Sequence, residues 1–279
     1  MRKLITKNPY FLAPMHNIND IVFRKLCKKA GAGLCWTELV NPESKKPIDL
    51  SDHPVVQLVC NQTKGIKEFI KKHDKNIVMY DFNLGCPSPH AKQSKVGWYM
   101  HKDFEKIKEI LKEIRKHTKK PICIKIRKLD PKATKEILKI AEEYCDIIAI
   151  HPRTCKQGYS GTPDIKYALK IKKQTNLPII FSGNITNKKQ ADNILKQFDY
   201  IMIGRKAIGN PNIFGDLTNN KSNITFDDYL KQAKKHHIDF NQIKRQAMTF
   251  TKGQRNSSKK REKIVFAKSI NEIKKILSL

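Results

Sequence analysis

ICIKIRKLDPKATKEILKIAEEYCDIIAIH, residues 122–151, is the stretch that decides the fold. Two short isoleucine-rich runs, 122–127 and 147–151, predict buried β-strands. Between them, residues 131–144 repeat apolar side chains at the spacing of an amphipathic helix. A strand, a helix and a second strand in this order predict two parallel strands joined by a helical crossover.

The same alternation extends along the chain in both directions. Strands are predicted at 11–14, 34–39, 55–59, 77–83, 122–127, 147–151, 178–182 and 200–204. Helices are predicted at 19–31, 64–73, 103–118, 131–144, 164–176 and 187–197. Eight strands alternating with helices over about 210 residues predict an α/β fold, a closed (β/α)8 TIM barrel. An open, doubly wound sheet is the alternative, which the absence of a GxGxxG after an early strand disfavours.

Two segments depart from this alternation. Residues 40–54 are too polar and proline-rich for a helix, so one unit of the barrel is expected to lack its helix. From about residue 216 no strands are predicted, and the sequence becomes helical, lysine-rich and nearly free of glycine. We therefore predict a catalytic barrel at 1–215 and a small all-helical domain at 216–279, with 219–223 as the linker.

The balance of charge is strongly basic. The 279 residues include 56 Lys and Arg against 26 Asp and Glu, a formal net charge of +30. Residues 230–279 hold 14 basic and 3 acidic side chains, a difference of +11 and about twice the share expected from an even distribution. A positive field of this size attracts polyanions, of which nucleic acid is the commonest in cells. A genome rich in A and T, which favours Lys, Asn and Ile, explains part of the excess.

Several classes of protein are disfavoured. No run approaches the roughly 20 apolar residues that span a bilayer, and the N-terminal apolar run is too short for a signal peptide. The seven cysteines are scattered without a CxxC pair, which argues against a zinc ribbon or a disulfide framework. We predict a cytoplasmic protein with no metal, no membrane association and no protein partner.

A group of mostly polar residues follows the predicted strands at their carboxyl ends, where a TIM barrel places its active site. In chain order these residues are Pro14, Met15, His16, Gln57, Asn83, Cys86, Lys125, Arg127, His151, Arg153, Ser182, Gly183, Asn184, Gly204 and Arg205. Such convergence on one rim is not expected of an arbitrary α/β chain.

Gly183, Gly204 and Arg205 have the character of a phosphate site. Glycines allow close approach of backbone N–H groups, and an arginine adds a planar charged fork. Residues 207–214, AIGNPNIF, are expected to form a short helix that completes the site. The alternative is that the glycines serve only as turns.

Three side chains raise chemical questions. The alternation of side chains along its strand places Lys125 inside the barrel, where its charge needs an anionic partner. That partner is either an electron-rich cofactor ring or a carboxylate in a salt bridge, Glu38 or Asp81. His151 lacks neighbours at metal-ligand spacing, so we expect a hydrogen-bond donor. Cys86, between a glycine and a proline, is either an apolar filler or a reactive thiol at a pocket rim.

The motifs together resemble the tRNA-dihydrouridine synthase family, flavin-dependent reductases of uridine in transfer RNA. Segments that resemble the family appear in its order and spacing at 13–34, 81–89 (DFNLGCPSP), 125–129 (KIRKL), 151–161 (HPRTCKQGYSG), 181–186 (FSGNIT) and 201–214. Each segment is weak alone, but six in register along nearly the whole chain are specific.

The resemblance implies an activity and a set of site residues. The activity is reduction of the C5=C6 bond of specific tRNA uridines to 5,6-dihydrouridine, with FMN and with NADPH or NADH as reductant. The residues implied to bind FMN are Pro14, Met15, His16, Gln57, Lys125, His151, Ser182, Gly183, Asn184, Gly204 and Arg205. Hydride from FMN would reach C6 and a proton from Cys86 would reach C5, with Asn83 and Arg153 at the substrate.

The chain departs from the family pattern near the substrate. Gly97 is followed by Trp98 and Tyr99 where small residues are usual, and His16 follows Met15 where a small residue is usual. Ser182 and Asn184 stand where Asn and Asp more often flank Gly183. The basic tail suits a grip on tRNA phosphates, with Arg255, Lys259, Lys260 and Arg261 as expected contacts or simply as a solvated helix face.

Two other functions fit part of the pattern. A flavin barrel enzyme acting on a free small molecule, similar to a dihydroorotate dehydrogenase, needs the barrel and the phosphate site but no basic tail. An RNA-binding protein without catalysis needs the tail, but it has no use for Cys86, Lys125 and His151.

Overall fold

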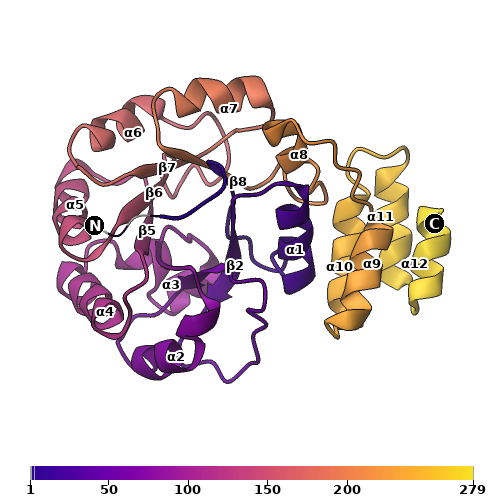
Figure 1. Ribbon diagram of the computed structural model, residues 1–279, viewed down its shortest axis with the longest axis horizontal. Coiled ribbons are helices and arrows are strands. Elements are labelled where there is room, and N and C mark those ends of the chain that lie inside the picture. Colours follow the sequence, from indigo (N-terminus) through magenta and orange to yellow (C-terminus); the bar gives the residue numbers. More distant parts are fainter. Residues whose placement is uncertain (1, 3, 279) are drawn as a thin grey trace.

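The computed structural model describes residues 2 and 4–278, in which eight parallel strands close into a barrel (Figure 1). The strands, each paired with its neighbours in chain order, are β1 (Tyr10–Leu12), β2 (Leu34–Val40), β3 (Val55–Leu58), β4 (Met79–Leu84), β5 (Ile122–Arg127), β6 (Ile147–His151), β7 (Ile179–Ser182) and β8 (Tyr200–Ile203). Every strand overlaps its predicted run, and β8 pairs with β1 to complete the circle. The predicted TIM barrel is confirmed.

Helices cover the outside of the barrel. The six predicted ones are α1 (Ile21–Ala30), α2 (Ile66–His73), α4 (Phe104–His117), α5 (Pro131–Tyr144), α6 (Ile165–Lys172) and α7 (Lys188–Leu195). Residues 41–54 contain no helix, as their composition predicts. The loop after β4 holds two short turns of helix that were not predicted, α3 (Pro89–Gln93) and a 3-10 turn at Gly97–Met100.

The barrel interior changes character from one end to the other. Because side chains alternate along a strand, every second residue points inward. Near the amino ends the inward residues are apolar and form a closed floor, to which Phe11, Trp36, Val55 and Met79 belong. One step further along β3, β4 and β5 the same inward row becomes polar, with Gln57, Asp81 and Lys125. Polar chemistry is therefore confined to the carboxyl end.

The C-terminal tail is helical and lies against the outer face of α1, on the right of Figure 1. Its helices are α9 (Phe226–Lys235), α10 (Phe240–Phe250), α11 (Ser257–Phe266) and α12 (Ile270–Leu277), preceded by α8 (Ile213–Thr218), which crosses the predicted domain boundary at 215/216. The apolar side chains of the tail join the core that lies between the barrel and its helices. No helix within residues 4–278 is both long and apolar enough to cross a membrane.

One carboxylate ties the tail to the barrel. Asp20 caps α1 by accepting a hydrogen bond from Phe23 N through Oδ1, at 2.9 Å. Its Oδ2 accepts from Tyr229 Oη at 3.1 Å, from Gln242 Nε2 at 2.8 Å and from Gln246 Nε2 at 2.7 Å. Because α1 follows the loop 13–19, the tail is anchored directly behind residues at the carboxyl end of β1.

We predict that Asp20→Ala lowers the free energy of unfolding by about 3 kcal/mol, since it removes a helix cap and three further hydrogen bonds. Asp103→Ala is the matched control, because Asp103 caps α4 through Lys106 N but has no hydrogen bond to the tail. That change should cost about 1 kcal/mol. Equal losses in denaturant titrations of the two variants would contradict the anchoring role.

Candidate active site

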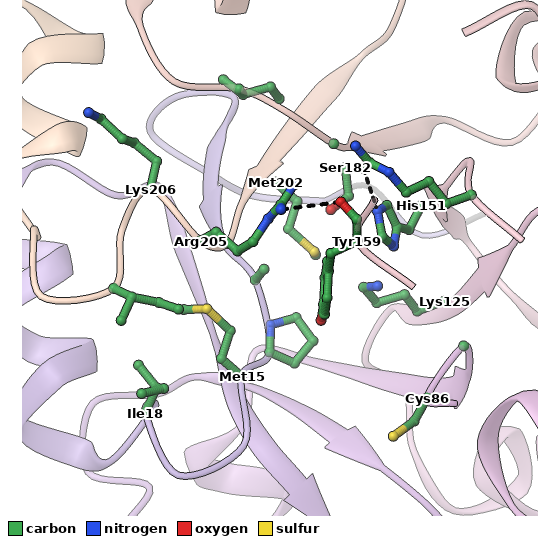
Figure 2. Close-up of a pocket in the computed structure, with 18 of the residues that line it drawn as sticks. Met15, Ile18, Cys86, Lys125, His151, Tyr159, Ser182, Met202, Arg205 and Lys206 are labelled. Atoms are coloured by element: carbon green, nitrogen blue, oxygen red, sulfur yellow. Dashed lines mark hydrogen bonds between the residues drawn. The ribbon is translucent and has the colours of Figure 1, made fainter. Parts of the chain in front are cut away.

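A cavity of about 880 Å³ opens at the carboxyl ends of the strands (Figure 2). Strands from all around the barrel contribute to its wall. All the residues predicted for the site line it: Pro14, Met15, His16, Gln57, Asn83, Cys86, Lys125, His151, Arg153, Ser182, Gly183, Asn184, Gly204 and Arg205. The structure thus brings the predicted residues together, while their individual roles stay predictions.

Tyr159 lies in the middle of this cavity and was not predicted (Figure 2). Its side chain is 61% exposed. The guanidinium carbons of Arg205 and Arg127 stand 5.1 and 5.7 Å from the centre of its ring. Tyr159 belongs to the loop after β6, where the alternation of a strand cannot predict which way a side chain points. The only sequence signal for Tyr159 was its place in the 151–161 motif.

The tail reaches the cavity as well. Lys252 lines it together with Lys206, and Lys252 Nζ donates a hydrogen bond to the backbone oxygen of Arg205 at 2.8 Å. Partial burial, Lys206 and Arg205 all lower the pKa of Lys252. A tail residue at this site could not be predicted from the sequence, because the contact depends on how two distant segments pack.

The loop that carries Cys86 is held from both sides. Asn83 Oδ1 accepts hydrogen bonds from the backbone N–H groups of Gly85 and Cys86, at 3.1 and 2.9 Å. Trp98 N donates to the backbone oxygen of Cys86 at 3.0 Å. The thiol is half-buried in the cavity wall and donates to Ser88 Oγ at 3.4 Å. Cys86 is therefore neither a filler of the core nor a free surface thiol.

Gly97 makes this arrangement possible. Its φ is +60°, in the left-handed region that favours glycine. A Cβ at this position would lie 2.8 Å from the backbone oxygen and 3.0 Å from the Cβ of Cys86. Gly97 and the backbone N–H of Trp98 thus approach the same Cys86 oxygen, which leaves no room for a side chain at position 97.

Lys125 makes no ion pair among the residues that the structure describes. Burial lowers the pKa of its ammonium group, and Asp81 opposes that shift without being in contact. The predicted alternative of a salt bridge to Glu38 or Asp81 is thus not formed. Glu38 instead accepts from Asn17 N at 2.9 Å, and burial raises the pKa of its carboxyl group. Lys125 remains available to an anionic group in the cavity.

His151 is a neutral ring in a cluster of cations. Burial, Lys125 and three arginines lower its pKa to about 2. Arg153 Nη1 lies 3.0 Å from His151 Nε2, and since arginine can only donate, Nε2 accepts and the ring proton sits on Nδ1. Within the described residues no three side chains of His, Cys, Asp or Glu gather as a metal site would require. The geometry makes His151 a donor through Nδ1.

Arg153 is fully buried, unlike a residue that awaits a substrate. It donates to the backbone oxygens of Ser160 and Gly161, at 3.0 and 2.6 Å, and to Asn184 Oδ1 at 2.9 Å. These bonds hold the loop that carries Tyr159. The geometry favours a supporting role, and the predicted contact of Arg153 with substrate stays untested.

The other end of the cavity has the character of an anion site. Asn184 Oδ1 also accepts from Arg205 Nη2 at 2.8 Å, which fixes the guanidinium at the rim. A Cβ on Gly183 would lie 2.9 Å from Pro163 Cβ, so only glycine fits this turn. The expected helix over 207–214 was wrong for 207–212, where the chain turns back on itself with Ala207 N bonded to Gly204 O at 2.8 Å. The helix begins only at Ile213.

The family model for Dihydrouridine synthase (Dus) matches residues 11–275. The chain belongs to this family. Among its relatives, tRNA-dihydrouridine synthase B of Pasteurella multocida is 33% identical over 227 residues, 75% of this chain and 68% of that protein. The protein of the same name from Xanthomonas campestris is 31% identical over 225 residues, 74% of this chain and 68% of that protein.

Solved structures share the barrel of this dihydrouridine synthase family member at low identity. A morphinone reductase mutant in complex with tetrahydroNAD matches with a TM-score of 0.55 at 10% identity, covering 77% of this chain and 87% of that one. An (S)-mandelate dehydrogenase mutant matches with a TM-score of 0.53 at 9% identity, over 77% and 74% of the two chains. These likenesses concern the fold alone.

We predict that Gly97→Ala changes the rate at which iodoacetamide alkylates Cys86 at least threefold. The added methyl group would displace the backbone of Cys86 and therefore its thiol. Gly158→Ala is the matched control, since Gly158 has a similar φ of +56° but no atom within 4 Å of the point where a Cβ would lie. Both changes carry a backbone strain of about 1 kcal/mol. Peptide mass spectrometry measures the rate, and equal behaviour of the two variants would refute the contact's role.

Proposed function

We propose that this protein reduces the C5=C6 bond of specific uridines in tRNA to 5,6-dihydrouridine, with FMN as its flavin and NADPH or NADH as reductant. Membership of the dihydrouridine synthase family supports this proposal. The observation that carries it is the position of Cys86, which shares one cavity with the cationic groups at the other strand ends. A proton donor and an anion site thus face the same space.

The cavity fits FMN in size and in charge. Its volume of about 880 Å³ suits a cofactor of that size. Arg205, Lys206 and Lys252 line the cavity, and no carboxylate is among the described lining residues, which favours a phosphate group. At the other end Lys125 has no ion pair with any described residue and Gln57 also lines the cavity, so both can bind the polar edge of a flavin ring.

The protein's own groups then have distinct tasks. Reduced FMN would supply the hydride that reaches C6 of the uracil. The Cys86 thiol gives its proton to C5, and the resulting thiolate regains a proton from water. Lys125 stabilises the negative charge that develops on the base. The bonds from Gly85 and Cys86 N–H to Asn83 hold the thiol in place during transfer.

The target uridine must leave its stack to reach the cavity. Tyr159 provides an exposed aromatic ring in the cavity, with the buried guanidinium of Arg127 5.7 Å from the ring centre, and this ring suits a base that has been turned out of the RNA. The basic tail beside α1 offers positive charge to the surrounding phosphates. These features favour RNA over a free small molecule as substrate.

The decisive test is nucleoside mass analysis of unmodified tRNA after incubation with the protein, FMN and NADPH. We expect a uridine to gain the mass of two hydrogens. Consumption of NADPH without that gain would point to a small-molecule substrate, as in a dihydroorotate dehydrogenase. No gain and no bound flavin would favour an RNA-binding protein without catalysis.

In the same assay we predict that Cys86→Ala lowers the rate of dihydrouridine formation about 100-fold or more, because the general acid is lost. Flavin binding and NADPH oxidation should persist. Cys155→Ala is the control, since Cys155 is also half-buried but does not line the cavity. Unchanged product yield in Cys86→Ala would remove this thiol from the mechanism.

For the tail, we predict that the double variant Arg255→Gln/Lys259→Gln weakens tRNA binding and lowers the slope of log affinity against log salt by about 1 to 2. Both side chains are exposed. Lys132→Gln/Lys135→Gln is the control of equal charge, on the exposed face of α5 across the barrel from the tail (Figure 1). Equal effects of the two double variants would show that only net charge matters.

A further inference from the structure

Asp81 is a carboxylate in the barrel interior with no exposed surface. Its Oδ2 accepts hydrogen bonds from Trp36 Nε1 at 2.8 Å and from Gln57 Nε2 at 2.6 Å. Its Oδ1 has no hydrogen-bond partner among the described residues. Burying such a group costs several kcal/mol, and the inward residue one step below, Met79, is apolar. Stability alone therefore does not explain the carboxylate.

The direction of the hydrogen bonds above Asp81 follows from its charge. An ionised carboxylate can only accept, so Gln57 must turn Nε2 toward it. Gln57 Oε1 then faces Asn83 and accepts from Asn83 Nδ2 at 2.8 Å. Asn83 in turn directs Oδ1 at the N–H groups of Gly85 and Cys86. The carboxylate at one end and the two backbone donors at the other thus favour the same orientation of both amide side chains.

We propose that Asp81 is a positioning residue, whose ionised carboxylate orients Gln57 in the cofactor cavity and, through Asn83, holds the loop that carries Cys86. That this loop serves uridine reduction rests on the proposed function. The orientation of the chain of bonds is a property of the folded protein, and it can be tested without RNA or flavin.

Protonation of Asp81 would remove this directional constraint. A protonated carboxyl can donate to Gln57 Oε1 as well as accept from Gln57 Nε2, so it no longer selects one orientation of that amide. Only the backbone N–H groups of Gly85 and Cys86 then oppose a turn of the two amides, and in the turned state Asn83 Nδ2 would face those donors and the loop would lose its acceptor. Burial raises the pKa of Asp81 to about 6, against the opposing effects of Gln57, Lys125 and Trp36. The change therefore falls in the mildly acid range.

Other titratable groups face Asp81 or its cavity. On β5 these are Lys125 and Cys123, and Cys145 lies beyond them; burial raises the pKa of both thiols, so they stay neutral in acid. His151 is neutral because of its low pKa. Glu38 also has a raised pKa and lies beside His16, with 3.4 Å between His16 Nδ1 and Glu38 Oε2. It is therefore a second carboxyl whose titration must be separated from that of Asp81.

The ionised form of Asp81 holds the Cys86 loop, but the same ionised form lowers the stability of the folded protein. Because folding raises the pKa of Asp81 to about 6, the ionised carboxylate destabilises the folded chain above that pH. This cost declines as the pH falls further and is absent only below the unfolded pKa of about 4. The Asp81→Asn variant removes the charge and keeps the shape. It should therefore melt several degrees higher than the wild type at pH 8, and the difference should fall to about half at pH 5 and be small below about pH 4.

The test follows modification of Cys86 by dithiodipyridine, which reacts with thiols in acid as well as at neutral pH, with the site identified by peptide mass spectrometry. At pH 8 we expect Asp81→Asn to change the rate at least threefold relative to wild type. At pH 5 the two rates should converge, because the wild-type carboxyl is then protonated too. Activity on tRNA, if present, should show the same convergence.

Two controls separate this role from general disturbance of the core. Trp36→Phe removes the other donor to Oδ2 and leaves the direction of the bonds through Gln57 unchanged, so its rate ratio to wild type should not depend on pH. Glu38→Gln tests the second carboxyl and should likewise give a constant ratio. The inference is overturned if Asp81→Asn fails to fold or is less stable at pH 8, or if its ratio to wild type is the same at both pH values.

Discussion

The closure of eight short strands into one barrel governs the rest of this molecule. Closure turns every second side chain inward, where the space admits only a few layers. The lower layer is filled by apolar groups such as Phe11 and Met79, which seal the amino end. The next layer is polar, and its members have no route to bulk water except through the cavity above. Their hydrogen bonds must therefore be made with one another or with a ligand.

This constraint explains why the site is so densely connected. Asp81, Gln57 and Asn83 form a row of hydrogen bonds that ends at the Cys86 loop. On the opposite side, Asn184 Oδ1 receives two arginines at once. Between these networks Lys125 has no ion pair in the described part of the chain. The two hydrogen-bond networks surround the ammonium group of Lys125, which still needs an anionic partner. The site is therefore preorganised for an anion.

The sequence was informative where local periodicity controls structure. Strand runs and their ends could be predicted because alternation and apolar runs are local properties, and a barrel places all strand ends at one rim. That is why residues as far apart as Met15 and Arg205 were correctly brought to one cavity. The missing helix at 41–54 was equally local, since its prolines and polar residues exclude one.

Prediction failed where conformation depends on packing between distant segments. Tyr159 enters the cavity because Arg153 holds its loop, and no sequence pattern within the loop predicts this contact. The turn at 207–212 replaced an expected helix because the backbone folds against the tail, where a Cβ on Gly209 would meet Thr249 O at 1.9 Å. Likewise Lys252 reaches the cavity only because α10 docks on the barrel.

The docking of α10 has a thermodynamic consequence. The helix bonds through Gln246 to the backbone oxygen of Ile18, behind the β1 rim, and Lys252, two residues past its end, bonds to the backbone oxygen of Arg205 at the anion end. Two walls of the cavity are thus braced by one helix. A macromolecule that shifts this helix on binding must alter the affinity of the cavity for its small ligand. Linkage then requires the small ligand to alter the affinity for the macromolecule by the same factor, so the two binding events are one coupled equilibrium.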